Sequence, residues 1–323
     1  MRTRREFLNL AAAACALPTA TRVAAAEAYP SRSVRILVGF AAGGAADLNA
    51  RLIGKWLSPR LGQLFIVENR VGAGGNIATE EVVRAAPDGY TLLNCASANT
   101  INATLYSNLK FDFIRDIAPI AGSLRLPNVL LLNPSVSART VPELIGYAKA
   151  HPGNLNFGSA GTGTAEHLAG EMFKMMTGVE MIHVPYRGGA QALTALLAGQ
   201  VQVYFCVTST ALAGIKSGMR PLAVTTSARW EGLPDVPAVS ESVPGYEVST
   251  WFGIGAPRQT PVDIIAKLNT EINGALADSG VKARLREIGA VPMPMTGAQF
   301  GAFIVAETEK WAKVIRAAKI TSG

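Results

Sequence analysis

The chain has 323 residues, of which 49% are hydrophobic and 16% are charged. This length allows a full hydrophobic core in about two domains, and the composition excludes a disordered protein, a collagen-like repeat and a small disulfide scaffold. The formal net charge is +7, but no run of five basic residues occurs and no aromatic patch is interleaved with the positive charges. Nucleic-acid binding is therefore not predicted.

The first 26 residues indicate an export signal. A twin-arginine pattern lies at Thr3–Leu8, an apolar run follows at 10–17, and Val23–Ala26 ends in an A-x-A cleavage site. The apolar run is shorter than the ~18 residues of a membrane span and is followed by Pro18, so a cleaved signal peptide is favoured over an anchor or a buried helix. A lipoprotein box at Cys15 is a minor alternative. Cleavage leaves residues 27–323 with a net charge of +4.

Strand-like and helix-like patterns alternate in the first part of the mature chain. Short apolar runs rich in Val, Ile and Leu favour strands, and apolar residues at helical spacing favour helices. The expected strands are 34–40, 65–67 and 91–95, the expected helices lie near 48–57 and 78–85, and glycine turns are expected at 41–46 and 71–75. This repeated order predicts a parallel sheet.

The same alternation restarts downstream. The expected strands are 129–132, 155–157, 181–184, 201–206 and 222–224, and the expected helices are 141–150, 165–177, 190–198, one that starts at Pro261 and one at 297–320. Thr260 is the expected cap of the helix that starts at Pro261. Two sets of units predict two lobes, each a mostly parallel sheet flanked by helices.

Extended stretches near 124–129 and 246–253 are the expected crossovers between the lobes. They divide the mature chain into a first lobe of 27–125 and 247–323 and a second lobe of 126–246.

Cys95 and Cys206 are the cysteines left after cleavage, and both lie in apolar strand-like runs. We expect two separate core thiols rather than a disulfide. No mature segment reaches the ~18 apolar residues of a membrane span.

Four junctions between a strand and a helix are rich in glycine: 41–44, 72–75, 158–164 and 186–189. Each places free backbone N–H groups at the start of a helix, where the helix dipole also favours an anion. Ser159 and Thr164 add hydroxyl donors. The sequence therefore predicts anion capture at the carboxyl ends of the strands, although glycine also occurs in such turns for geometry alone.

Three other polar residues near these junctions can each have either a structural role or a ligand-binding role. Asp47 either caps the helix after Gly43-Gly44 or binds a ligand through water, and the cap is favoured. His167 either reaches a ligand or makes a structural hydrogen bond, and Arg187 is either a charge partner for a ligand or a solvated loop residue. His151 is expected to end a helix.

No motif for a cofactor, a metal or catalysis is found. The 158–164 loop lacks the lysine of a phosphate-binding loop, and Phe157 stands where Gly-x-Ser-x-Gly needs its first glycine. The three histidines are too dispersed for a zinc site. A catalytic set of Cys206, His183 and an acid has no support from spacing. We expect no cofactor, no metal and no enzyme, with an exported enzyme kept as the least favoured alternative.

The order of the motifs resembles the Bug-type receptors, the periplasmic solute-binding proteins of tripartite tricarboxylate transporters. The resemblance covers almost the whole mature chain. The matching segments are 29–30, 38–47 with Arg51, 67–76, 86–92, 156–164 with His167, 184–189, 233–237, 251–253 and 256–257. Each segment alone is a weak signal, but all of them in this order are specific.

The resemblance implies a two-lobed clamshell that closes on a small carboxylate. Loops of the two lobes would hold the carboxylate through backbone N–H groups, hydroxyls and bridging waters. The residues that this implies are Phe40, Ala41, Gly43, Gly44, Asp47, Ser159, Gly161, Gly163, Thr164 and Tyr186, with Ser97 and Thr208 as weaker candidates at strand ends. The implied partners are transporter subunits in the membrane or, as an alternative, a sensor kinase, and the receptor is expected to be a monomer.

Two departures from the family pattern bear on the ligand. Ala41-Ala42 stands where the family often has a proline before the glycines, and Cys206 stands where many members carry an acid. Without that acid, a ligand with an ammonium group is less well supported. A mono- or dicarboxylate, aliphatic or aromatic, is therefore expected.

Overall fold

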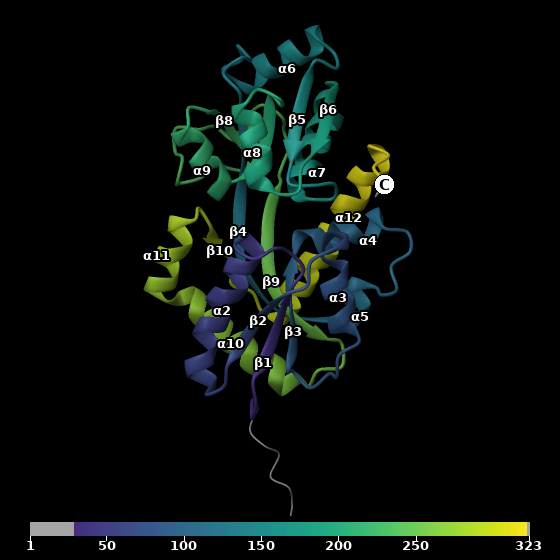
Figure 1. The fold of residues 1–323 in the computed structure, drawn as a ribbon, viewed down its shortest axis with the longest axis vertical. Coiled ribbons are helices and arrows are strands. Elements are labelled where there is room, and N and C mark those ends of the chain that lie inside the picture. Colours follow the sequence, from purple (N-terminus) through teal and green to yellow (C-terminus); the bar gives the residue numbers. More distant parts are fainter. Residues whose placement is uncertain (1–28, 322–323) are drawn as a thin grey trace, which may run out of the picture.

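The computed structural model describes residues 29–321 and has two lobes joined by two long strands (Figure 1). The expected export signal at 1–26 lies outside these residues. The sheet has the strand order β2-β1-β3-β9-β4-β7-β5-β6, and β10 and β8 both pair with β4. This two-lobed α/β architecture confirms the expected fold class. Within the described residues, no helix is long and apolar enough to cross a membrane.

The first lobe surrounds the β2-β1-β3-β9 part of the sheet. Its strands are β1 (Val34–Val38), β2 (Phe65–Asn69), β3 (Thr91–Ala96) and β10 (Val291–Pro292), with parts of β4 (Ile117–Leu132) and β9 (Ser249–Pro257). Its helices are α2 (Ala45–Leu61), η2 (Ala73–Gly75), α3 (Asn76–Val83), α4 (Ser97–Leu105), α5 (Phe113–Asp116), α10 (Val262–Ala277), α11 (Ser279–Glu287) and α12 (Gly297–Ala317). Strand β1 is apolar along almost its whole length because helices cover both faces of the sheet.

The second lobe surrounds the other end of the sheet. Its strands are β5 (Leu155–Ser159), β6 (Met181–Pro185), β7 (Val203–Val207) and β8 (Arg220–Val224), with the end of β4. Its helices are α6 (Val141–Ala150), α7 (Ala165–Thr177), α8 (Gly189–Leu197), α9 (Thr208–Lys216) and η3 (Val239–Glu241). Threonine starts two of them, since Thr140 accepts a hydrogen bond from the Glu143 amide and Thr164 from the His167 amide. His151 ends α6 as expected.

Strands β4 and β9 run side by side in the first lobe, and β4 continues into the second lobe (Figure 1). They pair antiparallel from Ile117↔Pro257 to Pro127↔Ser249, and from Asn128 onward β4 pairs with β7 and β8 instead. The stretch 124–129 lies within β4, and the stretch 246–253 includes the start of β9. Parallel pairing joins β2-β1-β3 and β6-β5-β7, as expected, whereas β3–β9, β4–β9 and β4–β7 are antiparallel.

Helix α12 belongs to the first lobe, but its end packs on the second. Trp311 lies in one buried cluster with Phe157 and Phe173 of the second lobe. The Glu307 carboxylate accepts hydrogen bonds from the indoles of Trp251 on β9 and of Trp311, each at 3.1 Å. The helix therefore braces the connecting strand against both lobes.

The structure tests two local predictions, one about the start of helix α10 and one about the two cysteines. Helix α10 begins at Val262 with Pro261 at the cap position, so Thr260 is not its cap, and the Thr260 hydroxyl donates to the Pro257 carbonyl instead. Cys95 and Cys206 are both buried and unpaired, as predicted. Each thiol occupies an interior position of a strand, β3 or β7, and burial raises its pKa.

Candidate functional site

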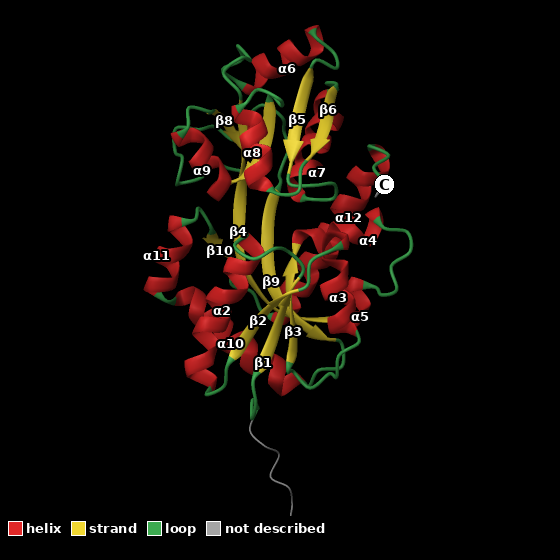
Figure 2. Ribbon diagram, viewed as in Figure 1, coloured by secondary structure: helices red, strands yellow, loops and turns green. Residues whose placement is uncertain are grey.

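The glycine-rich junctions of the two lobes face each other. The β5 and β6 arrows end on the side of the second lobe that is turned toward the first lobe (Figure 2). Two direct contacts join the lobes here. A Cβ at Gly163 would lie 2.5 Å from Leu105 Cδ2 on α4, and the Thr208 hydroxyl donates to the Gly289 carbonyl at 2.9 Å. On the second-lobe side these contacts come from the 158–164 loop and from the start of α9, and on the first-lobe side they come from α4 and from Gly289.

The first-lobe loop at 39–44 is held by a charged pair. The Asp47 carboxylate accepts the Gly43 amide at 3.0 Å and the Arg51 guanidinium at 2.8 Å, and it is only 2% exposed. Asn69 binds the same carboxylate and the Phe40 carbonyl. The hydrogen bond from Arg51 lowers the pKa of Asp47. The N-cap of α2 is Gly44, without a side-chain cap hydrogen bond, so Asp47 lies in the first turn of the helix and is not its cap, contrary to expectation. Its carboxylate holds the preceding loop instead.

The shape of the first-lobe loop also depends on a close backbone approach. A Cβ at Gly39 would lie 2.5 Å from Gly75 Cα, so only glycine fits. The Asn102 amide reaches across from α4 to the Gly74 carbonyl and to Asn76, each at 2.9 Å. Sequence reasoning missed Asn102, because its place beside the loops depends on helix α4, which was not predicted. Ser97 begins that helix and is 4% exposed.

Buried neutral groups hold the second-lobe loop at 159–164. The Ser159 hydroxyl accepts the Gly161 amide at 3.1 Å and shares a hydrogen bond of 2.7 Å with His183 Nε2. The Thr164 hydroxyl donates to the Gly161 carbonyl at 2.8 Å and accepts the His167 amide. Both predicted hydroxyl donors are thus engaged by the loop itself.

Two of the three histidines of the second lobe, His167 and His183, form a ring stack behind this loop. The His167 and His183 rings are 3.8 Å apart, and the Phe157 ring stacks on His183. His167 Nδ1 accepts the Gly163 amide at 3.2 Å, which is the structural role. Burial lowers the pKa of His167, and repulsion from His183 and from Lys174 adds to this effect, so that the pKa is about 3. Burial and Lys174 lower the pKa of His183 to about 4. Both rings are therefore neutral near pH 7.

The remaining predicted residues lie around the same junctions. Tyr186 follows β6, and its amide donates to the Ser159 carbonyl at 3.0 Å. Arg187 is exposed, and its amide donates to Gln191. Cys206 Sγ lies 3.7 Å from the Val129 carbonyl, whereas His183 binds Ser159. The structure therefore does not assemble Cys206 and His183 into a catalytic set.

Several loop amides have no acceptor in the protein. Within residues 29–321, this holds for Ala42 before α2, Thr162 before α7 and Gly188 before α8. Each belongs to the turn that precedes its helix, where the helix dipole favours an anion. The arrangement can therefore hold an anionic group through amides from both lobes, without a catalytic or metal-bound centre.

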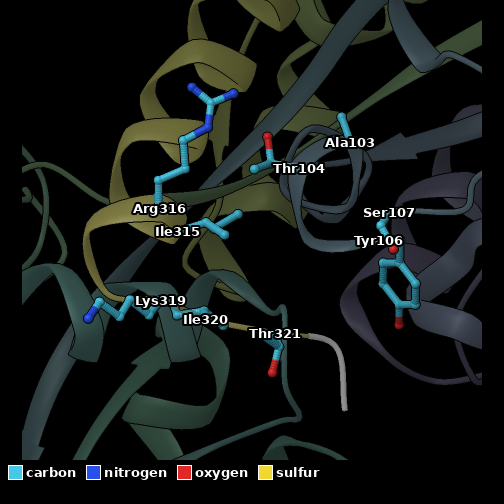
Figure 3. Close-up of a pocket in the computed structure, with 9 residues that line it drawn as sticks. All are labelled: Ala103, Thr104, Tyr106, Ser107, Ile315, Arg316, Lys319, Ile320 and Thr321. Atoms are coloured by element: carbon cyan, nitrogen blue, oxygen red, sulfur yellow. The ribbon is translucent and has the colours of Figure 1, made fainter.

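The described part of the chain has no group of three or more His, Cys, Asp or Glu side chains that could hold a metal. A surface hollow of about 560 Å³ lies elsewhere, between the ends of α4 and α12 (Figure 3). Its lining includes Thr104, Tyr106, Arg316 and Lys319, and it contains none of the loop residues. The hollow is therefore separate from the candidate site.

Fold and loops together define a two-lobed solute-binding protein. A family model described as "Tripartite tricarboxylate transporter family receptor" matches residues 49–320, so the chain belongs to this family. The expectation drawn from the motif order is thereby confirmed. The family consists of solute-binding receptors, and the protein is accordingly a receptor of the periplasmic type and not an enzyme.

Three solved structures are similar to most of the chain. Rpa4515 of R. palustris with adipate is 38% identical, covers 91% of this chain and 99% of its own, and has a TM-score of 0.84. The periplasmic binding protein BugD is 33% identical, with 91% and 99% coverage and a TM-score of 0.80. MatC from Rhodopseudomonas palustris with bound malate is 32% identical, with 89% and 100% coverage and a TM-score of 0.79.

Proposed function

We propose that this receptor captures a small mono- or dicarboxylate, aliphatic or aromatic, between its two lobes. The observation that carries the proposal is the set of unpartnered amides of Ala42, Thr162 and Gly188, which precede three helices on facing loops. Backbone amides at helix starts favour anions without needing a charged side chain. Adipate and malate, the ligands of two structural neighbours, are carboxylates of this kind.

The predicted residues then act in two ways. One group lines the ligand beside the free amides of Ala42, Thr162 and Gly188, and it consists of Phe40, Ala41, Gly43, Gly44, Gly161 and Gly163 together with the side chains of Tyr186 and Ser97. Asp47, Ser159, Thr164 and Thr208 support the loops, because each side chain is already hydrogen-bonded to backbone groups. Cys206 is buried in β7 and offers no carboxylate to an ammonium group. Ligands without an ammonium group are therefore preferred.

Ligand capture shifts the lobes toward the closed arrangement. We place the lobe boundaries near 125/126, within β4, and near 246/247, just before β9. These two connections and α12 are the segments that closure must bend. Closure excludes water, which strengthens each hydrogen bond between an amide and a carboxylate. A ligand shifts this equilibrium only through its higher affinity for the closed form.

The proposal also includes export of the receptor and delivery of its ligand to the membrane. The twin-arginine signal at 1–26 directs the chain to the periplasm and is removed there. The mature monomer then presents its ligand to the membrane subunits of a tripartite tricarboxylate transporter. A pull-down with the liganded receptor from membranes tests this step: recovery of transporter subunits supports it, whereas recovery of a sensor kinase alone replaces transport with signalling.

The ligand class is tested with the purified mature protein. Native mass spectrometry identifies any co-purified ligand, and thermal shifts are measured with adipate, malate and benzoate against sugars and cations. A ligand at 100 times its Kd stabilises the folded state by about 2.7 kcal/mol. An increase in melting temperature with sugars or cations, together with no increase with any carboxylate, contradicts the proposal.

A further inference from the structure

One buried acid lies directly behind the second-lobe loop. Glu166 is in the first turn of α7, and its side chain is 4% exposed. Its Oε2 atom accepts the Ala160 amide at 2.6 Å and the Tyr204 hydroxyl at 3.0 Å. Ala160 belongs to the loop after β5, whereas Tyr204 belongs to β7. This carboxyl group therefore ties the candidate binding loop to the sheet beneath it.

The surroundings of Glu166 contain no positive charge within ion-pair distance among the described residues. Strand β7 contributes the Tyr204 hydroxyl, the Cys206 thiol and the Val207 amide. Helix α8 begins at Gly189, where a Cβ would lie 3.9 Å from Glu166 Oε1. By contrast, Glu171 on the same helix is paired with Lys174 at 2.9 Å. Burial raises the pKa of Glu166 to about 7, although the amide and hydroxyl bonds oppose the rise.

We propose that Glu166 is a positioning residue for ligand capture, which holds the Ala160 amide and takes up a proton when an anionic ligand occupies the loop. This inference rests on the proposed function. A ligand carboxylate held by the 159–164 loop brings a second negative charge close to a carboxyl group that has no cation beside it. Like charges at short range favour the protonated form of the side chain. Binding and protonation must then strengthen each other reciprocally.

The other titratable groups around this loop do not compete for that proton between pH 6 and 8. His167 on α7 and His183 on β6 stay neutral, because their pKa values are lowered to about 3 and about 4. The pKa values of Tyr204 and Cys206 on β7 are raised well above their ordinary values. Glu171 on α7 is paired with Lys174, and Arg187 lies in the turn before α8. Proton uptake on binding therefore identifies Glu166.

The test is calorimetry of the mature protein with adipate, malate and benzoate at pH 7, in PIPES and in Tris, which differ in ionisation enthalpy. The dependence of the binding enthalpy on the buffer counts the protons taken up. We expect uptake approaching about half a proton, because Glu166 is about half ionised at pH 7. Above pH 7, Kd should rise by a factor that approaches ten per pH unit.

Glu166→Gln keeps an acceptor for Ala160 and removes the titration. This variant should take up no proton, and its Kd should be flat between pH 7 and 8, whereas the matched control Glu171→Gln should retain the uptake. Equal wild-type enthalpies in both buffers, or unchanged uptake in Glu166→Gln, overturn the inference. The wild-type comparison needs no variant, so it decides the matter even if Glu166→Gln fails to fold. Absence of binding by all three carboxylates overturns the proposed function instead.

Discussion

The two loops that face each other across the lobes are stabilised in opposite ways. The first-lobe loop depends on a backbone approach at Gly39 and on the ion pair between Asp47 and Arg51. The second-lobe loop depends on Glu166, which has no cation within ion-pair distance among the described residues, and on His167 and His183. Of the two histidines, His167 has its Nε2 atom 4.0 Å from Glu171 Oε1. An ionised, paired carboxylate is insensitive to pH near neutrality, whereas the buried Glu166 carboxyl group, with a pKa of about 7, titrates there.

This difference gives the lobes separate tasks. The first-lobe loop keeps one shape over the whole range in which the receptor works, because its charges stay fixed. The second-lobe loop responds to a change of charge nearby, because the side chains that support it carry little or no charge near neutral pH. We therefore expect pH effects on binding and on stability to arise mainly from the second lobe.

The largest expected effect tests the backbone approach in the first lobe. Gly39→Ala would place a Cβ 2.5 Å from Gly75 Cα, where two backbones must separate. We expect the free energy of unfolding to fall by about 3 kcal/mol in urea denaturation. Gly43→Ala is the control, because Gly43 has a φ of +80° but open space around its Cβ, and it should cost only about 1 kcal/mol. Equal losses for the two variants would show that the approach at Gly39 is relaxed in solution.

A smaller effect tests the neutral supports of the second lobe. The pKa of His183 is about 4 in the folded protein, below its ordinary value of 6.5, so the unfolded chain binds more protons as pH falls through that window. Stability should therefore decrease from pH 6.5 toward pH 4. His183→Gln should reduce this decrease by about 1–2 kcal/mol over pH 6.5 to 4.5, since His183 is partly exposed. The measurement is denaturant unfolding at several pH values.

His151→Gln is the matched control for this variant. His151 is exposed at the end of α6 and contacts the Tyr147 carbonyl. This variant removes a histidine that lies outside the ring stack. An unchanged pH dependence in His183→Gln, or an equal change in His151→Gln, would mean that the ring stack is not the acid-sensitive element.

Much of the fold was predictable because local patterns agreed with the final structure. Helix α7 spans Ala165–Thr177 as expected, since Thr164 starts it and Gly178 ends it in the left-handed conformation. Helices α4 and α9 were missed because each follows its strand with no intervening turn. The antiparallel pairing of β4 and β9 was also missed, because the partner of a strand is set by contacts between residues far apart in the sequence.

The candidate site was predictable only as a set of loops. Glycine spacing located the junctions, and their positions between the lobes follow from the sheet. The support by Glu166 was not foreseen, because its partner Tyr204 lies 38 residues away on another strand. Sequence alone could also not tell that the hydroxyls of Ser159 and Thr164 are occupied by their own loop.

The smallest expected effect tests whether the first lobe is indeed insensitive to pH. Asp47→Asn removes the charge that pairs with Arg51 and should lower the free energy of unfolding by about 1 kcal/mol, because Arg51 is half exposed. The pKa of Asp47 is lowered below its ordinary 3.8, so its stabilising contribution is complete above that value and is lost only as pH falls below it. The difference between wild type and Asp47→Asn should therefore be the same at pH 5 and pH 7 in urea denaturation. A difference that changes between these two pH values would place a titrating group in the first lobe and remove the contrast between the loops.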